Sequence, residues 1–223
     1  QSQNGAALVA SADVASVTAT LQAATGALSG VYVETAGAVP TDLMFNGLVE
    51  GAVSGASINA AGGIVRVRNN STLRNRDNSS QSVAFSSEAS GPNAAVAIDN
   101  RGDVVGAVRF GAGADLFDNS GLWNGAGAVH DFGGGQDQFI NHVAGRFIAA
   151  GNANVAEVTR LSNLERVVNR GLISLADGGA DDVLIVGGDI SFAAGSVLAV
   201  NINGAADTDL LSASGTVELN GVT

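Results

Sequence analysis

The residues best suited to chemistry in this sequence are two aspartates that each follow a glycine-rich stretch. Asp115 lies two positions before Phe117, and Asp137 lies two positions before Phe139. The segments that end at Phe117 and Phe139 each match most of the nonapeptide repeat whose aspartates bind calcium in β-rolls. Calcium needs six or more oxygen ligands, which β-rolls collect from consecutive nine-residue turns, whereas these aspartates are 22 residues apart. We therefore expect Asp115 and Asp137 to accept backbone hydrogen bonds at tight turns, with calcium binding as the alternative.

A second candidate for an ion is the acidic pair Asp181 and Asp182, which follows Asp177 closely in the sequence. Adjacent carboxylates offer the oxygen ligands that calcium prefers. The same residues could equally form a solvated corner between two strands. Asp181 and Asp182 therefore join Asp115 and Asp137 as calcium candidates, and we expect no other cofactor.

A third candidate is Arg101-Gly102-Asp103, which spells the tripeptide that integrins recognise. Such recognition needs the tripeptide at an exposed loop tip. Gly102 has a second explanation, because Asn100-Arg101-Gly102 has the same spacing as Asn119-Ser120-Gly121. We keep Arg101, Gly102 and Asp103 as an adhesion candidate, and favour a structural corner as its interpretation.

The sequence offers few groups for catalysis. His130 and His142 are the two histidines of the chain, and histidine is the side chain whose unperturbed pKa lies nearest to 7. No Gly-x-Ser-x-Gly elbow is present, and the absence of cysteine excludes thiol catalysis, disulfides and cysteine-based zinc sites. We therefore expect no catalytic residue.

Charge and composition narrow the partners. The formal net charge is -11, and every basic residue apart from the two histidines is arginine. An acidic chain repels nucleic acids and anionic membranes, so neither is an expected partner. The one basic stretch is interpreted as a solvated face that pairs with acidic residues; it contains Arg66, Arg68, Arg74 and Arg76. A polysaccharide-active enzyme would instead need aspartates and arginines that face one groove.

Internal repeats determine the expected fold. The sequence contains 31 glycines and 46% hydrophobic residues but only 4% aromatic residues, a composition that suits short strands around a narrow core. Glycine-Asp-apolar phrases and Asn-x-Gly phrases recur about every 20–22 residues. A unit of this size cannot bury its own apolar face, but stacked units can. We expect an all-β, right-handed, single-stranded parallel β-helix, a β-solenoid with roughly 20–22 residues per rung.

The expected organisation has three parts. Residues 1–50 form an N-terminal cap or irregular first rungs, residues 51–162 form β-helix rungs, and residues 163–223 form the C-terminal rungs. Trp123 is expected to stack in the core or to close a rung. The other residues expected to point inward are Phe110, Phe117, Phe139, Phe147, Ile173, Leu184, Ile185, Leu198 and Leu210.

The last sixty residues resemble the end of an autotransporter (type V secretion) passenger domain. The resemblance is carried by Asn163–Leu175, Asp182–Gly188, Gly195–Val200 and Asp207–Gly221, and the glycine-Asp-Phe phrases at 111–121 and 133–141 are also common in such passengers. It implies that residues 163–223 are an autochaperone-like region that promotes folding during secretion. It also implies display at the bacterial cell surface, or secretion, after passage through the periplasm and outer membrane. A C-terminal outer-membrane barrel of the full-length protein would then be a partner; the sequence here does not include it.

The expected function is therefore a non-catalytic surface or secreted passenger that acts as an adhesin or display stalk. Its partner would be a ligand on a host cell or a neighbouring cell, or another copy of the chain. A self-assembling surface-layer or filament subunit is the alternative. A polysaccharide-active enzyme on the same fold is the third interpretation.

The inward assignment leads to a test at Leu184. Leu184→Asp would bury an unpaired charge, so we expect it to destabilise the fold by several kcal/mol. Thermal denaturation followed by circular dichroism measures this. A melting temperature within a few degrees of that of the wild type would show that Leu184 does not point inward.

Overall fold

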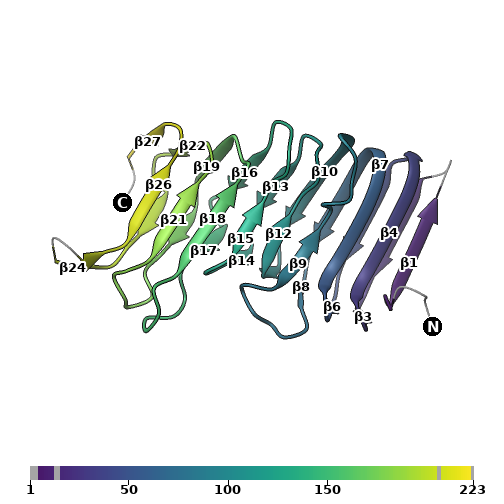
Figure 1. Ribbon diagram of the computed structural model, residues 1–223, viewed down its shortest axis with the longest axis horizontal. Helices are drawn as coiled ribbons and strands as arrows, with labels where there is room; N and C mark the ends of the chain where they lie inside the picture. Colours follow the sequence, from purple (N-terminus) through teal and green to yellow (C-terminus); the bar gives the residue numbers. More distant parts are fainter. Residues whose placement is uncertain (1–4, 13–15, 205–206, 222–223) are drawn as a thin grey trace.

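The chain folds into a parallel β-solenoid of about eight turns in the computed structural model (Figure 1). The structure describes residues 5–12, 16–204 and 207–221, and these residues contain strands, turns and bends but no helix. Successive turns stack along the rod from the N-terminal β1 to the C-terminal β27. The all-β solenoid expected from the repeats is confirmed.

Each turn contributes strands to three faces. The first face consists of β2 (Val17–Leu21), β5 (Thr41–Phe45), the second half of β7 (Ser54–Asn69), β10 (Asn93–Asn100), β13 (Leu116–Asn119), β16 (Gln138–Asn141), β19 (Arg166–Asn169), β22 (Asp189–Phe192) and β27 (Val217–Leu219). The second consists of β3 (Ala24–Gly26), β6 (Val49–Gly51), β8 (Thr72–Asn75), β11 (Asp103–Val105), β14 (Leu122–Asn124), β17 (Arg146–Ile148), β20 (Leu172–Ser174) and β23 (Val197–Ala199).

The third face consists of β1 (Leu8–Ala12), β4 (Ser29–Ala38), the first half of β7, β9 (Val83–Ser86), β12 (Ala107–Arg109), β15 (Val129–Asp131), β18 (Val158–Ser162), β21 (Val183–Val186) and β26 (Leu210–Ala213). Because β7 runs through both, the first and third faces form one 17-stranded sheet. Between β23 and β26, β24 (Ile202–Gly204) and β25 (Asp207–Thr208) pair antiparallel.

Strand pairing is continuous along the rod. The described residues between 5 and 50 supply strands to all three faces, where a cap or irregular first rungs were expected; residues 1–4 and 13–15 lie outside the described part. Pairing also continues past residue 163, through β16–β19 and β18–β21. Turn length varies more than the repeats indicate, because 31 residues separate Asn69 from Asn100 and 19 separate Asn100 from Asn119. Extra residues are accommodated at the corners, so the strands stay in register.

The core is narrow and contains an aromatic cluster at mid-length. Trp123 is fully buried, stacks on Phe147 with ring centroids 4.4 Å apart and meets Phe117 edge-on at 4.6 Å. Its indole N–H donates to the Gly106 carbonyl oxygen at 3.2 Å, so the polar atom of the ring is satisfied. Trp123 therefore stacks in the core, which was one of the two expectations.

Two inward assignments from the sequence are wrong. Ile185 follows the buried Leu184 in β21, and alternation along a strand turns it to the outer side. Leu210 is 53% exposed, because Asp209 and Leu211 are the residues of that segment that turn towards the interior. Leu198 is only partly buried and packs against the edge of the core. The remaining six expected residues are at most 1% exposed.

A column of buried asparagines occupies the corner between the first and second faces. The five side chains are fully buried and end successive strands of the first face, as Asn69, Asn100, Asn119, Asn141 and Asn169. The amide nitrogen of each of the first four donates to the amide oxygen of the next asparagine at 2.7–2.8 Å. The same nitrogens also donate to backbone carbonyls of the corner. Phe45 precedes the column in register and Phe192 follows it, so apolar residues enclose both ends.

The recurring Asn-x-Gly phrase does not reflect left-handed backbone at its asparagines, because the only described non-glycine residues with positive φ are Asn78 and Asn163. The corner glycines serve close packing instead. A Cβ on Gly102 would lie 2.0 Å from the Ser71 carbonyl oxygen, and one on Gly121 would lie 2.0 Å from that of Gly102.

Asn119→Leu tests the asparagine column. The leucine would leave one N–H of the Asn100 amide and the Asn141 amide oxygen without their partners in the core. Each orphaned buried group costs about 1–3 kcal/mol, so we expect the melting temperature to fall by roughly 5–10 °C. Asn70→Leu is the matched control, because Asn70 makes an equivalent 2.8 Å amide–amide bond to Asn46 in an exposed position. Equal losses in the two variants would contradict a special role for the column.

Candidate functional site

A charged hollow lies on the outer side of the first face, across β2, β5, β7, β10 and β13. Its volume is about 290 Å³. Strand alternation brings outward-facing charged residues to it from neighbouring turns. The polar residues and methionine that line it are Thr18, Thr20, Asp42, Met44, Arg66, Arg68, Asp99 and Asp118. We refer to this surface as the charged groove.

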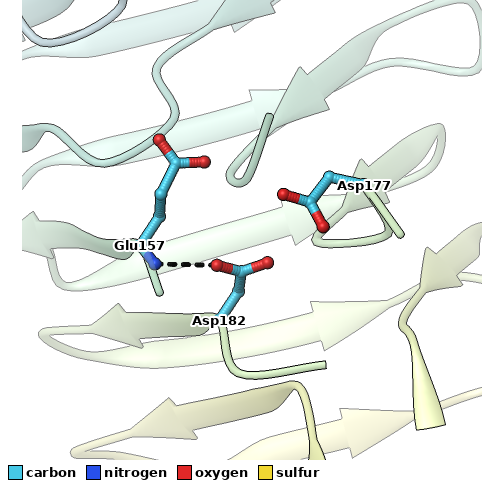
Figure 2. Close-up of side chains that lie close together, drawn as sticks. All are labelled: Glu157, Asp177 and Asp182. Atoms are coloured by element: carbon cyan, nitrogen blue, oxygen red, sulfur yellow. Dashed lines mark hydrogen bonds between the residues drawn. The ribbon is translucent and has the colours of Figure 1, made fainter. Parts of the chain in front are cut away.

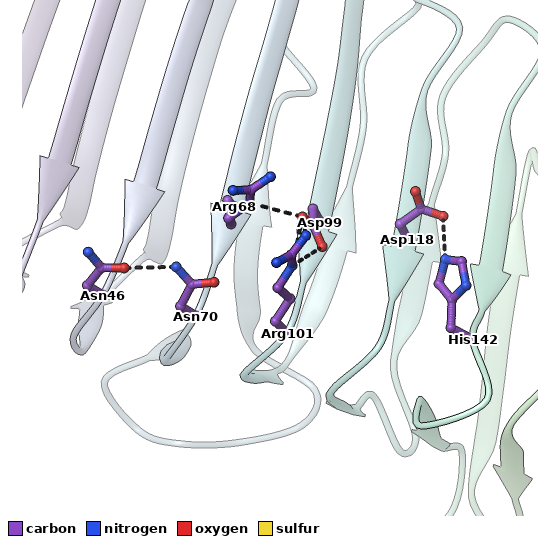
Figure 3. Close-up of polar contacts among 7 residues, drawn as sticks. All are labelled: Asn46, Arg68, Asn70, Asp99, Arg101, Asp118 and His142. Atoms are coloured by element: carbon purple, nitrogen blue, oxygen red, sulfur yellow. Dashed lines mark hydrogen bonds and ion pairs between the residues drawn. The ribbon is translucent and has the colours of Figure 1, made fainter.

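Ion pairs connect the strands that form the charged groove (Figure 3). Arg68 Nε lies 3.0 Å from Asp99 Oδ2, and Arg101 Nη2 lies 2.9 Å from the same oxygen. His142 Nε2 lies 3.2 Å from Asp118 Oδ1 at the next corner. Further along the groove Arg66 Nη1 lies 3.5 Å from Asp42 Oδ1.

The groove brings two aspartates close together. Asp99 and Asp118 occupy paired positions on β10 and β13, and neighbouring strands are about 4.8 Å apart. A pair of neighbouring carboxylates is what glycoside hydrolysis uses as acid and base or nucleophile. Here each carboxylate already has a cationic or imidazole partner. Fixed, paired charges on an open face suit the binding of a polar ligand.

The basic stretch seen in the sequence is divided between two faces. Arg66 and Arg68 lie in the charged groove, whereas Arg74 lies on β8 of the second face, with Nη2 3.0 Å from Glu50 Oε2. Arg76 donates to the Gly26 carbonyl oxygen. The arginines of the basic stretch therefore pair mainly with acidic residues, as we expected from the sequence.

Arg101-Gly102-Asp103 forms a corner of the solenoid. Arg101 and Asp103 are exposed, but the Arg101 guanidinium is held by Asp99, and the hydrogen bond and charge of Asp99 raise the pKa of Arg101. Gly102 packs against the backbone of Ser71, as described above. Adhesion through this tripeptide stays a prediction. At this corner the arginine already has Asp99 as its partner.

The two histidines have different environments. His130 is fully buried against Trp123, with ring centroids 4.4 Å apart, and burial lowers its pKa to about 3. The Val108 amide donates to His130 Nδ1 at 3.2 Å, so Nε2 carries the proton and donates to Gly125 O at 3.1 Å. His130 is thus a neutral core residue, and His142 is the histidine that faces the outer surface.

Asp115 and Asp137 belong to a column of acidic side chains at another corner. Each precedes a strand of the first face, and its carboxylate accepts the backbone N–H of the turn before: Val96 N–H to Asp115 at 2.7 Å, and Asp115 N–H to Asp137 at 2.6 Å. Glu165 continues the column by accepting the Asp137 N–H at 2.6 Å. These are the backbone bonds expected of the aspartates, made between turns.

Burial leaves these carboxyl groups partly unsatisfied. Asp115 and Asp137 are at most 2% exposed, and Oδ2 of each has no hydrogen-bond partner. Burial raises the pKa of Asp115 to about 6. Burial, together with the charges of Asp115 and Glu165, raises the pKa of Asp137 to about 7.

The two residues of the second acidic candidate, Asp181 and Asp182, lie in different environments. Asp181 is exposed, whereas Asp182 is 1% exposed and lies beside Glu157 and Asp177 (Figure 2). Glu157 could not be selected from the sequence, because it lies in a different turn. The available signal was its position directly before β18, which matches that of Asp182 before β21.

The raised pKa values predict how stability depends on pH. A carboxyl group whose folded pKa exceeds its unfolded value of 3.8 stabilises the fold fully below pH 3.8, and this contribution is lost as the pH rises through the folded value. We therefore expect the melting temperature to be higher at about pH 5 than at about pH 8, by roughly 5 °C.

Asp137→Asn removes one of these titrating groups and keeps an acceptor for the Asp115 N–H. We expect it to flatten the pH dependence, with its largest gain relative to the wild type at the alkaline end. Asp103→Asn at an exposed position is the control. Melting curves recorded between about pH 5 and pH 8 measure this. If the melting temperature of Asp137→Asn depended on pH as steeply as that of the wild type, Asp137 would not be one of the titrating groups.

Comparison with known proteins leaves the family open. No protein-family model matches the chain, no curated protein matches it, and no solved structure matches it. Within the described residues, no helix has the length and apolar character needed to cross a membrane.

Proposed function

We propose that this chain is a non-catalytic stalk, displayed on a bacterial surface or secreted, that holds ligand-binding surfaces along a stiff rod. The observation that carries the proposal is the unbroken stacking of turns on three faces. In-register parallel ladders pair the backbone groups of neighbouring turns, and the buried asparagine column adds side-chain bonds along the same axis. Such a rod resists bending and leaves few unpaired backbone groups for a protease to engage.

The chemistry of the surface supports binding over catalysis. His130 is buried in the core, and His142 is paired with Asp118. Asp99 and the arginines around it neutralise one another. The charged groove thus offers fixed hydrogen-bonding groups to a polar ligand on a neighbouring or host cell.

The resemblance of residues 163–223 to an autotransporter passenger supports the location that we propose. In this proposal the C-terminal turns fold first outside the outer membrane and template the turns before them. An outer-membrane barrel of the full-length protein would anchor the stalk.

Cell fractionation tests this proposal. We expect the native product to extend beyond Thr223 by the length of a β-barrel, to fractionate with the outer membrane, and to be stained by antibodies on intact cells. A periplasmic protein that stays unstained in the same cells is the control. A product found only in the cytoplasm would overturn the proposal, as would hydrolysis or lyase activity of the purified chain on pectin or alginate.

A further inference from the structure

The strongest unassigned feature is a group of three carboxylates at the corner between the second and third faces. Glu157 directly precedes β18, and Asp182 directly precedes β21, which pairs with β18. Asp177 comes from the connection between β20 and β21. One carboxylate oxygen from each residue lies within 4.8 Å of the other two (Figure 2). Two stacked turns thus bring together acids that are 25 residues apart along the chain.

Backbone amides hold each carboxylate in place through one oxygen. Asp182 Oδ1 accepts the Glu157 N–H at 2.8 Å, and Asp177 Oδ1 accepts the Gly179 N–H at 2.8 Å. Glu157 Oε2 accepts the N–H groups of Gly151 and Asn152 at 2.6 and 3.0 Å. The site is therefore preorganised, and each side chain keeps a second oxygen for another partner.

The second oxygens of the two aspartates have no such partner. Oδ2 of Asp182 and Oδ2 of Asp177 are buried and accept no hydrogen bond, and Asp182 is only 1% exposed. Figure 2 shows the free oxygen of Asp182 directed towards Asp177. A buried, unpartnered carboxylate oxygen is costly, so this orientation indicates a missing positive group.

No positive side chain of the described residues fills this position. None of the three acids forms an ion pair with an arginine or histidine in the described part of the chain, and the sequence contains no lysine. The three carboxylates therefore lie together with no positive side chain among the described residues to neutralise them.

We propose that Glu157, Asp177 and Asp182 bind one calcium ion that clamps the two stacked turns together. All the ligands are hard carboxylate oxygens, the type that calcium and magnesium prefer. Calcium accepts six to eight oxygens in flexible geometry, whereas magnesium demands a near-ideal octahedron and gives up its water reluctantly, so a set of carboxylates from two separate turns suits calcium better. Solvent reaches the partly exposed Asp177, and water would complete the coordination.

Thermal denaturation and calorimetric titration of the purified chain test this site with calcium alone. After removal of metal by a chelator, about 5 mM calcium chloride should raise the melting temperature by roughly 5 °C if the affinity is that of an extracellular module. Titration should show one site per chain. Magnesium at the same concentration should produce a clearly smaller shift.

Asp177→Asn is the decisive variant, because asparagine keeps the oxygen that accepts the Gly179 N–H and removes the charge. We expect it to weaken calcium binding by about tenfold or more. Asp181→Asn makes the same change of charge at the exposed neighbour and should bind like the wild type. Asp182→Asn is the companion variant in the buried position, and Asp177→Asn keeps the test valid if that protein fails to fold.

Three outcomes would overturn the proposal: no calcium-dependent shift in the wild type, an equal loss of binding in Asp181→Asn and Asp177→Asn, or a magnesium shift as large as that of calcium. Stabilisation by acid alone, without any response to calcium, would assign the neutralising role to protons. The cellular location of the protein enters none of these measurements, so this result and that of the stalk proposal are separable.

Discussion

Stacking of parallel turns in register is the constraint on which this structure depends. It places each residue about 4.8 Å from its counterpart in the turns above and below, so like side chains come to lie on like. Apolar residues tolerate this arrangement, since phenylalanine on phenylalanine makes a core. Buried polar residues tolerate it only if they can bond to copies of themselves. An amide carries both a donor and an acceptor, and Asn100, Asn119 and Asn141 can therefore fill an interior column with all of its bonds made.

Carboxylates respond differently to the same constraint, because an ionised carboxylate only accepts hydrogen bonds. Asp115 and Asp137 cannot bond to each other's side chains, so each takes a backbone amide of the preceding turn. Their second oxygens stay unsatisfied, and burial raises the pKa values of both groups, with the charges of Asp115 and Glu165 adding to the rise at Asp137. Where three acids meet at Glu157, Asp177 and Asp182, the same arrangement concentrates enough charge to attract a cation. The core asparagines and the corner acids are thus two responses to one stacking rule.

Much of the fold could be predicted from the sequence, and the reasons are local. Strand alternation places Phe117, Phe139 and Leu184 inside with no knowledge of their neighbours. It failed at Ile185 and Leu210, where a run of adjacent apolar residues does not reveal which of them points inward. The Asn-x-Gly corners were located correctly, but the buried asparagine column was not foreseen, because hydrogen bonds between side chains of different turns cannot be inferred until the register is known.

The candidate sites were less predictable, since each is assembled across turns. Asp182 could be selected from its acidic neighbours, but Glu157 is a lone acid in a different turn. The charged groove likewise combines Arg68, Asp99 and Asp118 from three turns of unequal length. A sequence period estimated from a few phrases cannot give that pairing, because one turn has 19 residues and another has 31.

Unequal turn length also has a mechanical consequence. Force applied along the rod from its ends would peel the turns away singly, each opening a loop whose extended length follows its residue number. At roughly 3.4 Å per residue, the turn of 19 residues would release about 65 Å and the turn of 31 residues about 105 Å. Turns of different length would therefore give extension steps of different size when the rod is pulled. The sizes of successive steps would show the order in which the turns open.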